Sequence, residues 1–184
     1  MGSSLSSSAS CAPETGLPCA RKGLGLRLPR VPLGGVFPRE FTCDGADVNP
    51  GAAWHRGPCG TRSFAVLMDD PDAVPAVGFV FVHWGVVNVP ANVLRIRQDQ
   101  DWDQVPRAVQ LRNSFGQIGW GGPCPPPGDP PHRYRFRLYA MSVPCVPLSA
   151  ADPPTTVTEF EQRFGRWILA TGRWHAFYAR PAGV

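Results

Sequence analysis

The sequence predicts a mainly β protein, an antiparallel β-sandwich with a few peripheral helices, one of them near the C-terminus. Three observations lead to this fold class: short apolar runs rich in β-branched and aromatic residues, proline and glycine at their junctions, and one late helical pattern. The 184 residues include 22 prolines and 20 glycines, which divide the chain into short strands and turns. Long helices are therefore not expected.

The expected strands follow in chain order. Residues 24–28 alternate between apolar and other residues, as an exposed-edge strand does. Residues 63–68 and 78–89 are nearly continuous apolar runs, typical of strands buried on both faces. Residues 134–140 alternate Tyr, Phe, Leu and Ala with arginines, which indicates a half-buried strand.

One segment, residues 155–174, has helical periodicity. Val157, Phe160 and Phe164, followed by Trp167 or Ile168, are spaced three and four residues apart. Thr156 or Thr158 is placed to cap its N-terminus. The pattern predicts a helix over this segment.

Residues 23–184 are predicted to form a single domain, and residues 1–22 a disordered serine-rich tail. The first residues have no signal-peptide pattern, and no stretch approaches the roughly 20 apolar residues that cross a membrane, so we expect a soluble, cytoplasmic protein. Gly2 and Ser6 fit the N-myristoylation pattern, with Cys11 as a second acylation site. A serine-rich leader, a cloning remnant or a misplaced start codon explains the same residues.

The net charge of +4 arises from 17 arginines and Lys22, spread without a cluster that would follow a nucleic-acid backbone. We therefore expect no nucleic-acid partner. The six cysteines contain no C-x-x-C pair, so no structural metal site and no cofactor are expected. Free thiols are the preferred state for a chain without a secretory signal, and a Cys43–Cys124 disulfide is the alternative to test first.

Three carboxylates follow an expected buried strand at the point where the chain leaves the core. Asp69, Asp70 and Asp72 lie there, and Pro71 stiffens the turn that holds them. Such carboxylates can orient a histidine. An ordinary solvated acidic turn is the alternative.

Two histidines are candidates to meet these carboxylates. His83 lies inside an apolar run, where a hydrogen-bonded interior histidine is the simpler interpretation. His132 ends the loop 119–134, which its glycines bend and its prolines stiffen. If both meet an aspartate, charged imidazoles and the N–H groups of Gly121 and Gly122 would donate to a bound anion.

The chain also contains seven motifs in a fixed order. They are T-C-D-G at 42–45, N-P-x-x-x-W at 49–54, D-D-P-D-A at 69–73, H-W-x-V-x-N-x-P at 83–90, N-S-F-G at 113–116, G-G-P-C-P-P-P-G at 121–128 and H-R-Y at 132–134. This set resembles the phosphatidylethanolamine-binding proteins, and more closely their bacterial and archaeal Raf-kinase-inhibitor-like branch. The resemblance implies a Greek-key β-sandwich with a preformed pocket for phosphate-like groups, including phospholipid head groups, and no catalysis.

The resemblance also implies site residues, carried over by position. The ligand-binding set comprises Asp70, Asp72, His83, Gly121, Gly122, Pro123, His132 and Tyr134. Trp120, where the branch commonly has tyrosine, and Tyr178 are expected at the rim. The family includes inhibitors of kinases and of serine carboxypeptidases, so a regulated kinase or protease is an expected partner.

Two other functions compete with a binding protein. The first is a hydrolase in which His83 or His132, oriented by Asp70, activates Ser114. The chain has no G-x-S-x-G elbow to hold such a serine. The second is a purely protein-directed inhibitor whose pocket has lost its ligand.

Overall fold

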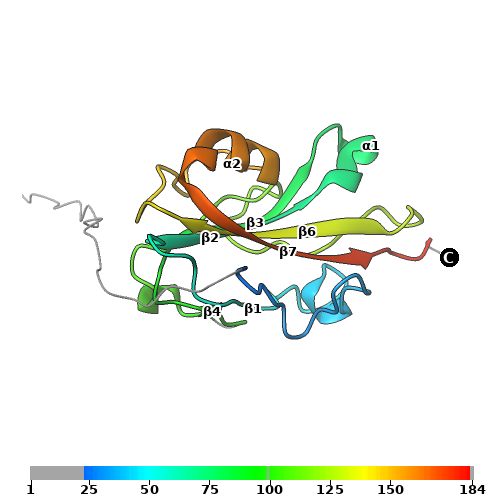
Figure 1. Ribbon diagram of the computed structural model, residues 1–184. Coiled ribbons are helices and arrows are strands. Elements are labelled where there is room, and N and C mark those ends of the chain that lie inside the picture. The colour runs from blue at the N-terminus through cyan, green and yellow to red at the C-terminus, as the bar shows by residue number, and fades with distance from the viewer. Residues whose placement is uncertain (1–22, 99, 183–184) are drawn as a thin grey trace, which may run out of the picture.

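Two antiparallel sheets and two short α-helices make up the described part of this computed structural model, which covers residues 23–98 and 100–182 (Figure 1). The larger sheet contains β2 (Ser63–Asp70), β3 (Phe81–Pro90), β5 (Val109–Gln110), β6 (His132–Met141) and β7 (Ile168–Tyr178). The smaller sheet pairs β1 (Ala52–Ala53) with β4 (Arg95–Ile96). The helices are α1 (Val74–Val77) and α2 (Val157–Phe164), and 3-10 turns lie at Arg39–Phe41, Pro71–Ala73, Trp102–Gln104 and Gly165–Trp167.

The predicted tail, residues 1–22 with its lipidation pattern, lies outside the described residues. The boundary of the expected domain at residue 23 stays a prediction for the same reason.

The large sheet has the order β5-β3-β2-β6-β7. Three successive strands of this sheet, β2, β3 and β5, lie next to one another, and the following strand β6 returns to the open side of β2. This spatial order is that of a Greek key. The predicted mainly β, antiparallel fold is confirmed.

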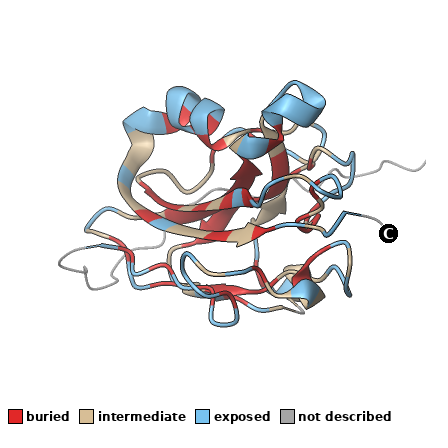
Figure 2. Ribbon diagram, turned by 90° about the vertical axis from the view of Figure 1, so that its right-hand side faces the viewer, coloured by how far each residue is buried: buried red, intermediate tan, exposed pale blue. Residues whose placement is uncertain are grey.

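The large sheet forms the middle layer of the molecule. In Figure 1, α1 and α2 lie on one of its faces, and β1 and β4 lie on the other. One buried cluster, which includes Phe64, Trp84 and Phe136, fills the space toward the small sheet. A second cluster, which includes Tyr139 and Phe160, packs under α2. Figure 2 shows the buried residues concentrated along the strands and the exposed ones on the outer sides of the helices.

The C-terminal helix is shorter than predicted. Thr156 caps it through a capping box with Glu159, but α2 ends at Phe164, and residues 168–174 belong to β7. Strand β7 pairs with β6 from Ile168 to Tyr178, so it gains a full ladder of backbone hydrogen bonds. Since that ladder depends on a partner distant in sequence, the local period could not indicate it.

The first predicted strand is also wrong in part. Residues 24–28 alternate inward and outward as expected, with Leu24, Leu26 and Leu28 buried. They make an isolated bridge through Arg27 to Ala53 rather than a strand.

The preference for free thiols is wrong. Cys43 and Cys124 form a disulfide with Cα atoms 5.4 Å apart. Cys59 and Cys145 are disulfide-bonded as well. The Cys43–Cys124 bond closes a separation of 81 residues, which no local sequence pattern reveals.

Candidate functional site

A cavity of about 320 Å³ lies at the end of the large sheet, where β2 ends and where β3 and β6 begin. Four predicted site residues, Asp70, His83, His132 and Tyr134, line it together with Ser114. Its remaining lining is mainly apolar and consists of Ala73, Ala76, Val77, Phe81, Phe115, Cys124, Pro125 and Pro126.

Sheet pairing explains why these residues meet. Asp70 is the last residue of β2, and His132 is the first of β6, which runs antiparallel beside β2. Because strand side chains alternate between faces, His132 and Tyr134 lie on the same face of β6. All three side chains are buried.

His83 reaches the cavity because β3 is irregular at this point. Trp84 pairs with Met68, and Val82 pairs with Asp69, so His83 is an extra residue in the ladder. Such a bulge changes the direction of a side chain and is common beside functional sites. The His83 ring packs edge-on against Tyr134, with ring centres 5.1 Å apart.

His132 is held between two carboxylates. Its Nδ1 donates to Oδ2 of Asp70 at 2.7 Å, and its Nε2 lies 3.6 Å from Oδ2 of Asp129. The other oxygen of Asp70 accepts the N–H of Asp72 at 2.9 Å. Burial raises the pKa of Asp70, and the hydrogen bond from His132 opposes that rise. Asp70 therefore orients the imidazole, which is one of the two interpretations that the sequence left open.

His83 is neutral near pH 7. Its Nδ1 donates to the carbonyl of Gly121 at 2.7 Å. Burial lowers the pKa of His83 to about 4 against its ordinary 6.5, and this outweighs the carbonyl contacts that favour the charged ring. The prediction of a charged donor at His83 is therefore wrong, and Nε2 of the neutral ring is an acceptor.

The Tyr134 hydroxyl is buried and forms no hydrogen bond of good geometry, although the Asp70 carboxylate and the Cys124 backbone N–H lie close to it. Burial raises the pKa of Tyr134, and the Asp70 charge raises it further, so the phenol keeps its proton. An unpartnered buried hydroxyl is costly. The Tyr134 hydroxyl can therefore donate a hydrogen bond to a ligand in the cavity.

The glycine-rich wall acts on the site indirectly. The Gly122 N–H donates to Oδ1 of Asp47 at 2.8 Å, and the Gly121 N–H donates to the carbonyl of His83 at 2.9 Å. Both amides are therefore engaged, and the prediction that they donate to an anion is wrong. Glycine is needed at 122 because a Cβ there would collide with the carbonyl of Phe41. The Pro123 carbonyl accepts the N–H of Cys43. Gly121, Gly122 and Pro123 therefore do not line the cavity themselves but support the residues after them that do.

Three other predicted residues lie outside the cavity lining. Asp72 is exposed and accepts the N–H of Arg133 at 2.8 Å, which fixes the start of β6. Trp120 packs into the main core against Trp84 rather than at the rim. Tyr178 pairs with His132 across β6 and β7, and its hydroxyl donates to Asp44 at 2.8 Å.

Sequence reasoning missed the aromatic side of the cavity. Phe81 and Phe115 pack edge-to-face with ring centres 4.6 Å apart, and the half-exposed Val77 also lines the cavity. Phe115 belongs to the N-S-F-G motif, and this motif could have identified it from the sequence. Asp129 was missed as well, although it lies three residues before His132.

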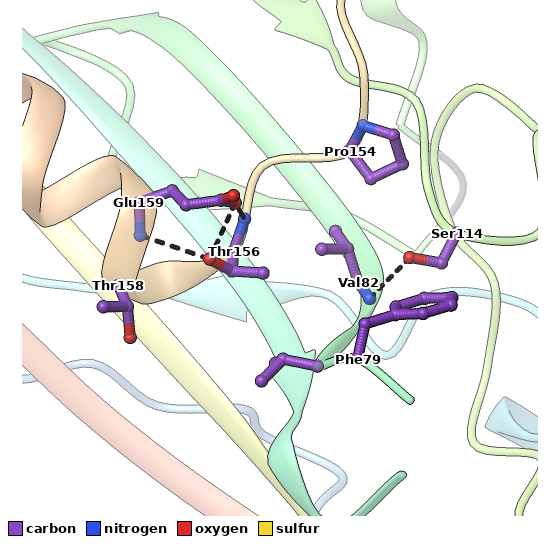
Figure 3. Close-up of a pocket in the computed structure, with 8 residues that line it drawn as sticks. Phe79, Val82, Ser114, Pro154, Thr156, Thr158 and Glu159 are labelled. Atoms are coloured by element: carbon purple, nitrogen blue, oxygen red, sulfur yellow. Dashed lines mark hydrogen bonds between the residues drawn. The ribbon is translucent and has the colours of Figure 1, made fainter. Parts of the chain in front are cut away.

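A second cavity of about 590 Å³ lies beside α2 (Figure 3). It shares Ser114 with the first cavity and is otherwise bounded by Val82, Pro154 and the first residues of α2. Most of its polar groups already bond to one another: Ser114 accepts the Val82 N–H, and Thr156 and Glu159 form the capping box. The first cavity is therefore the candidate site. Within the described ranges, no cluster of His, Cys, Asp and Glu suited to a metal ion occurs in either place.

The fold and the cavity define a mainly antiparallel β protein with a small cavity lined by two histidines, an aspartate and a tyrosine at one sheet end. A family model described as phosphatidylethanolamine-binding protein matches residues 28–179. The chain belongs to this family and to its bacterial and archaeal branch, as the sequence motifs predicted.

Individual relatives agree with this assignment. The chain is 37% identical to the UPF0098 protein of Aquifex aeolicus over 150 residues, which are 80% of this chain and 83% of the relative. The crystal structure of Escherichia coli YbcL matches with a TM-score of 0.74 and 30% identity over 86% of this chain and 99% of YbcL. A phosphatidylethanolamine-binding protein homologue from Chlamydia trachomatis matches with a TM-score of 0.69 and 26% identity, over 86% of this chain and 98% of the homologue.

Proposed function

We propose that the protein binds a phosphate-like anion in the cavity lined by His83, His132 and Tyr134, without catalysis. One observation carries this proposal: the buried Tyr134 hydroxyl forms no hydrogen bond of good geometry and lines a cavity beside a histidine oriented by Asp70. A tetrahedral anion offers the acceptors that this hydroxyl and the His132 ring require.

The neutral His83 restricts the protonation state of the ligand. Its Nε2 accepts a hydrogen bond, so it fits an anion that also carries an O–H. A phosphomonoester, whose second pKa is about 6, supplies that O–H in its monoanionic form. A phosphodiester has no such proton, so its binding requires His83 to take up a proton from solvent.

The apolar walls favour a phosphorylated organic ligand or a phospholipid head group over free phosphate. Phe81, Phe115 and Val77 border the space above the polar groups. The cavity volume of about 320 Å³ is at the lower end of the range for small-molecule sites. This volume is larger than a single inorganic ion needs. A substituent on the phosphate would bury its apolar surface there.

Hydrolysis is the second candidate and has weaker support. A nucleophile needs a base within hydrogen-bonding reach. The Ser114 hydroxyl accepts the Val82 N–H at 2.9 Å, whereas the ring Nδ1 atoms of His83 and His132 bond to Gly121 and Asp70. A serine–histidine hydrogen bond is thus not formed among the described residues.

Calorimetric titration with phosphate, phosphoethanolamine and acetate tests the binding proposal. Tyr134→Phe removes one charge-assisted hydrogen bond, so we expect phosphate affinity to fall by roughly tenfold or more. Tyr178→Phe is the matched control, since its hydroxyl bonds to Asp44 outside the cavity. Equal phosphate affinities for the two variants would contradict the proposal, and turnover of a phosphoester would favour the hydrolase.

Regulation of a kinase or a protease stays a prediction, as does the cellular location. In the described parts of the chain, no helix is both long and apolar enough to pass through a membrane. The Cys43–Cys124 bond counts against the predicted cytoplasmic location, because disulfides persist mainly in oxidising compartments. We propose such a compartment, which thiol labelling of the native protein from its host would test.

A further inference from the structure

Strands β6 and β7 place basic side chains opposite one another on the face of the large sheet that carries the helices. Arg135 pairs with His175, and Arg137 pairs with Arg173, as direct cross-strand neighbours. Tyr139, two residues after Arg137 and hence on the same face, donates its hydroxyl to Glu161 of α2 at 2.9 Å. These four basic residues form what we call the arginine face.

The acids near the arginine face are already engaged. Asp69 accepts from Arg135 through both oxygens at 2.8 and 2.9 Å, and one of these also accepts the Val157 N–H at 3.0 Å. Glu161 accepts from Tyr139. The described residues therefore leave Arg137 and Arg173 without an ion pair, and Arg137 bonds only to the carbonyl of Phe136 at 3.1 Å.

This arrangement costs the folded protein stability. Like charges directly opposite each other on neighbouring strands repel. Arg137 is half-buried, and burial lowers its pKa; the charges of Arg135 and Arg173 lower it further, while Tyr139 and the nearby Glu161, which forms no ion pair with Arg137, oppose the shift without cancelling it. A half-buried arginine without a carboxylate partner is unusual, because burial of a cation is normally compensated by an acid.

We propose that Arg137 and Arg173 bind the carboxylates of an acidic, extended segment of a partner protein. The charge is complementary, and two guanidinium groups side by side can each hold a carboxylate through paired hydrogen bonds. The partner relieves the repulsion that the free protein carries.

The surroundings favour an extended chain over other occupants. Helices α1 and α2 both stand on this face of the sheet (Figure 1), so a flat membrane would meet the helices before the strands between them. Residues 1–22 of the chain carry Glu14, Arg21 and Lys22, a net charge of −1 + 2 = +1, and so do not complement an arginine pair. The proposal does not depend on the ligand cavity, since His132 and Tyr134 lie on the opposite face of β6.

Fluorescence anisotropy with a short labelled poly-glutamate peptide tests the proposal on the full chain at low ionic strength. We expect Arg173→Gln and Arg137→Gln each to raise the dissociation constant roughly tenfold. Arg95→Gln is the matched control, because Arg95 is an exposed strand arginine on the small sheet. It removes the same charge, and we expect less than a twofold change.

A second readout separates binding from folding. Since Arg173→Gln removes a like charge opposite Arg137, we expect its free energy of unfolding without peptide to be unchanged or higher. The proposal is overturned if wild type does not bind the peptide or if Arg95→Gln weakens binding as much as Arg173→Gln. It is also overturned if Arg173→Gln releases the protein from phosphatidylserine vesicles, or dissociates a dimer, while peptide binding is unchanged.

Discussion

At the scale of single residues, the two site histidines have the same chemistry but different environments. His132 donates to a carboxylate, whereas His83 donates to a carbonyl and is surrounded by Phe81, Phe115 and Tyr134. Asp70 orients the His132 ring, whereas burial among aromatic rings keeps His83 neutral. One histidine is therefore suited to donate to an anion, and the other to accept from its O–H.

The neutral His83 makes the stability of the protein depend on pH. The unfolded chain binds a proton at His83 near pH 6.5, but the folded chain binds it only near pH 4. Stability from this residue is therefore fully present above about pH 6.5 and is lost as the pH falls toward 4, by on the order of 3 kcal/mol. Urea unfolding across this range should show a smaller loss for His83→Gln than for wild type. An identical loss in both proteins would show that His83 is not buried in its neutral form.

The low pKa of His83 also leads to a prediction of how phosphodiester affinity depends on pH. If the bound diester requires a charged His83, its affinity falls by about tenfold for each unit of pH above the free pKa, until the bound pKa is reached. Calorimetry in buffers of different ionisation enthalpy should detect the uptake of about one proton for a diester. The comparison is made near pH 5, where a phosphomonoester is already mainly the monoanion and brings its own proton. There the monoester should require less uptake than the diester, and equal uptake for the two ligands would argue against the acceptor role of His83.

At the scale of elements, Asp69 joins three of them. The side chain extends from β2, bonds Arg135 of β6 and accepts the first N–H of α2. It also neutralises one member of the arginine face. The position of α2 on the sheet thus depends on a buried acid next to the one that orients His132.

Asp69→Ala should therefore destabilise the protein strongly. It leaves Arg135 and the Val157 N–H without their partner, and breaking a buried ion pair costs on the order of 3 kcal/mol. Denaturant unfolding measures this change. Asp152→Ala is the control, since Asp152 is exposed and bonds only the local Ser149. A loss no larger than that of the control would mean that α2 is held by its apolar contacts alone.

At the scale of the whole molecule, the Cys43–Cys124 disulfide links the segment after the 3-10 turn Arg39–Phe41 to the wall of the cavity. Cys124 lines the cavity, and the Cys43 N–H donates to the carbonyl of the preceding Pro123. The bond therefore holds the glycine-rich wall against the segment that follows Phe41. We therefore expect this bond to affect both the stability of the protein and the proposed ligand binding.

Replacing both cysteines by serine should lower the free energy of unfolding by roughly 2–5 kcal/mol, because the unfolded chain loses a long-range constraint. Phosphate affinity should fall as well, since the wall is less restrained. Guanidinium unfolding and calorimetry measure the two effects. The double variant is preferable to a reducing agent, which would also act on the bonds of Cys59 and Cys145. Unchanged stability would show that the rest of the fold alone fixes the wall.

The sequence by itself determined the fold class, the family and most of the cavity's polar residues. The apolar runs at 63–68 and 78–89 and the alternation at 134–140 are local patterns, because each records the burial of a strand along its own length. The family motifs identified Asp70, His83, His132 and Tyr134, which share the cavity.

Only the tertiary structure decided the chemistry of these residues. The neutral His83 depends on the aromatic rings around it, and the engaged amides of Gly121 and Gly122 depend on Asp47 and a bulged strand. Strand β7 and the Cys43–Cys124 bond require partners far along the chain. The physical reason is common to all: a protonation state, a free donor or a strand ladder is a property of neighbours in space, and a local pattern records only neighbours in sequence.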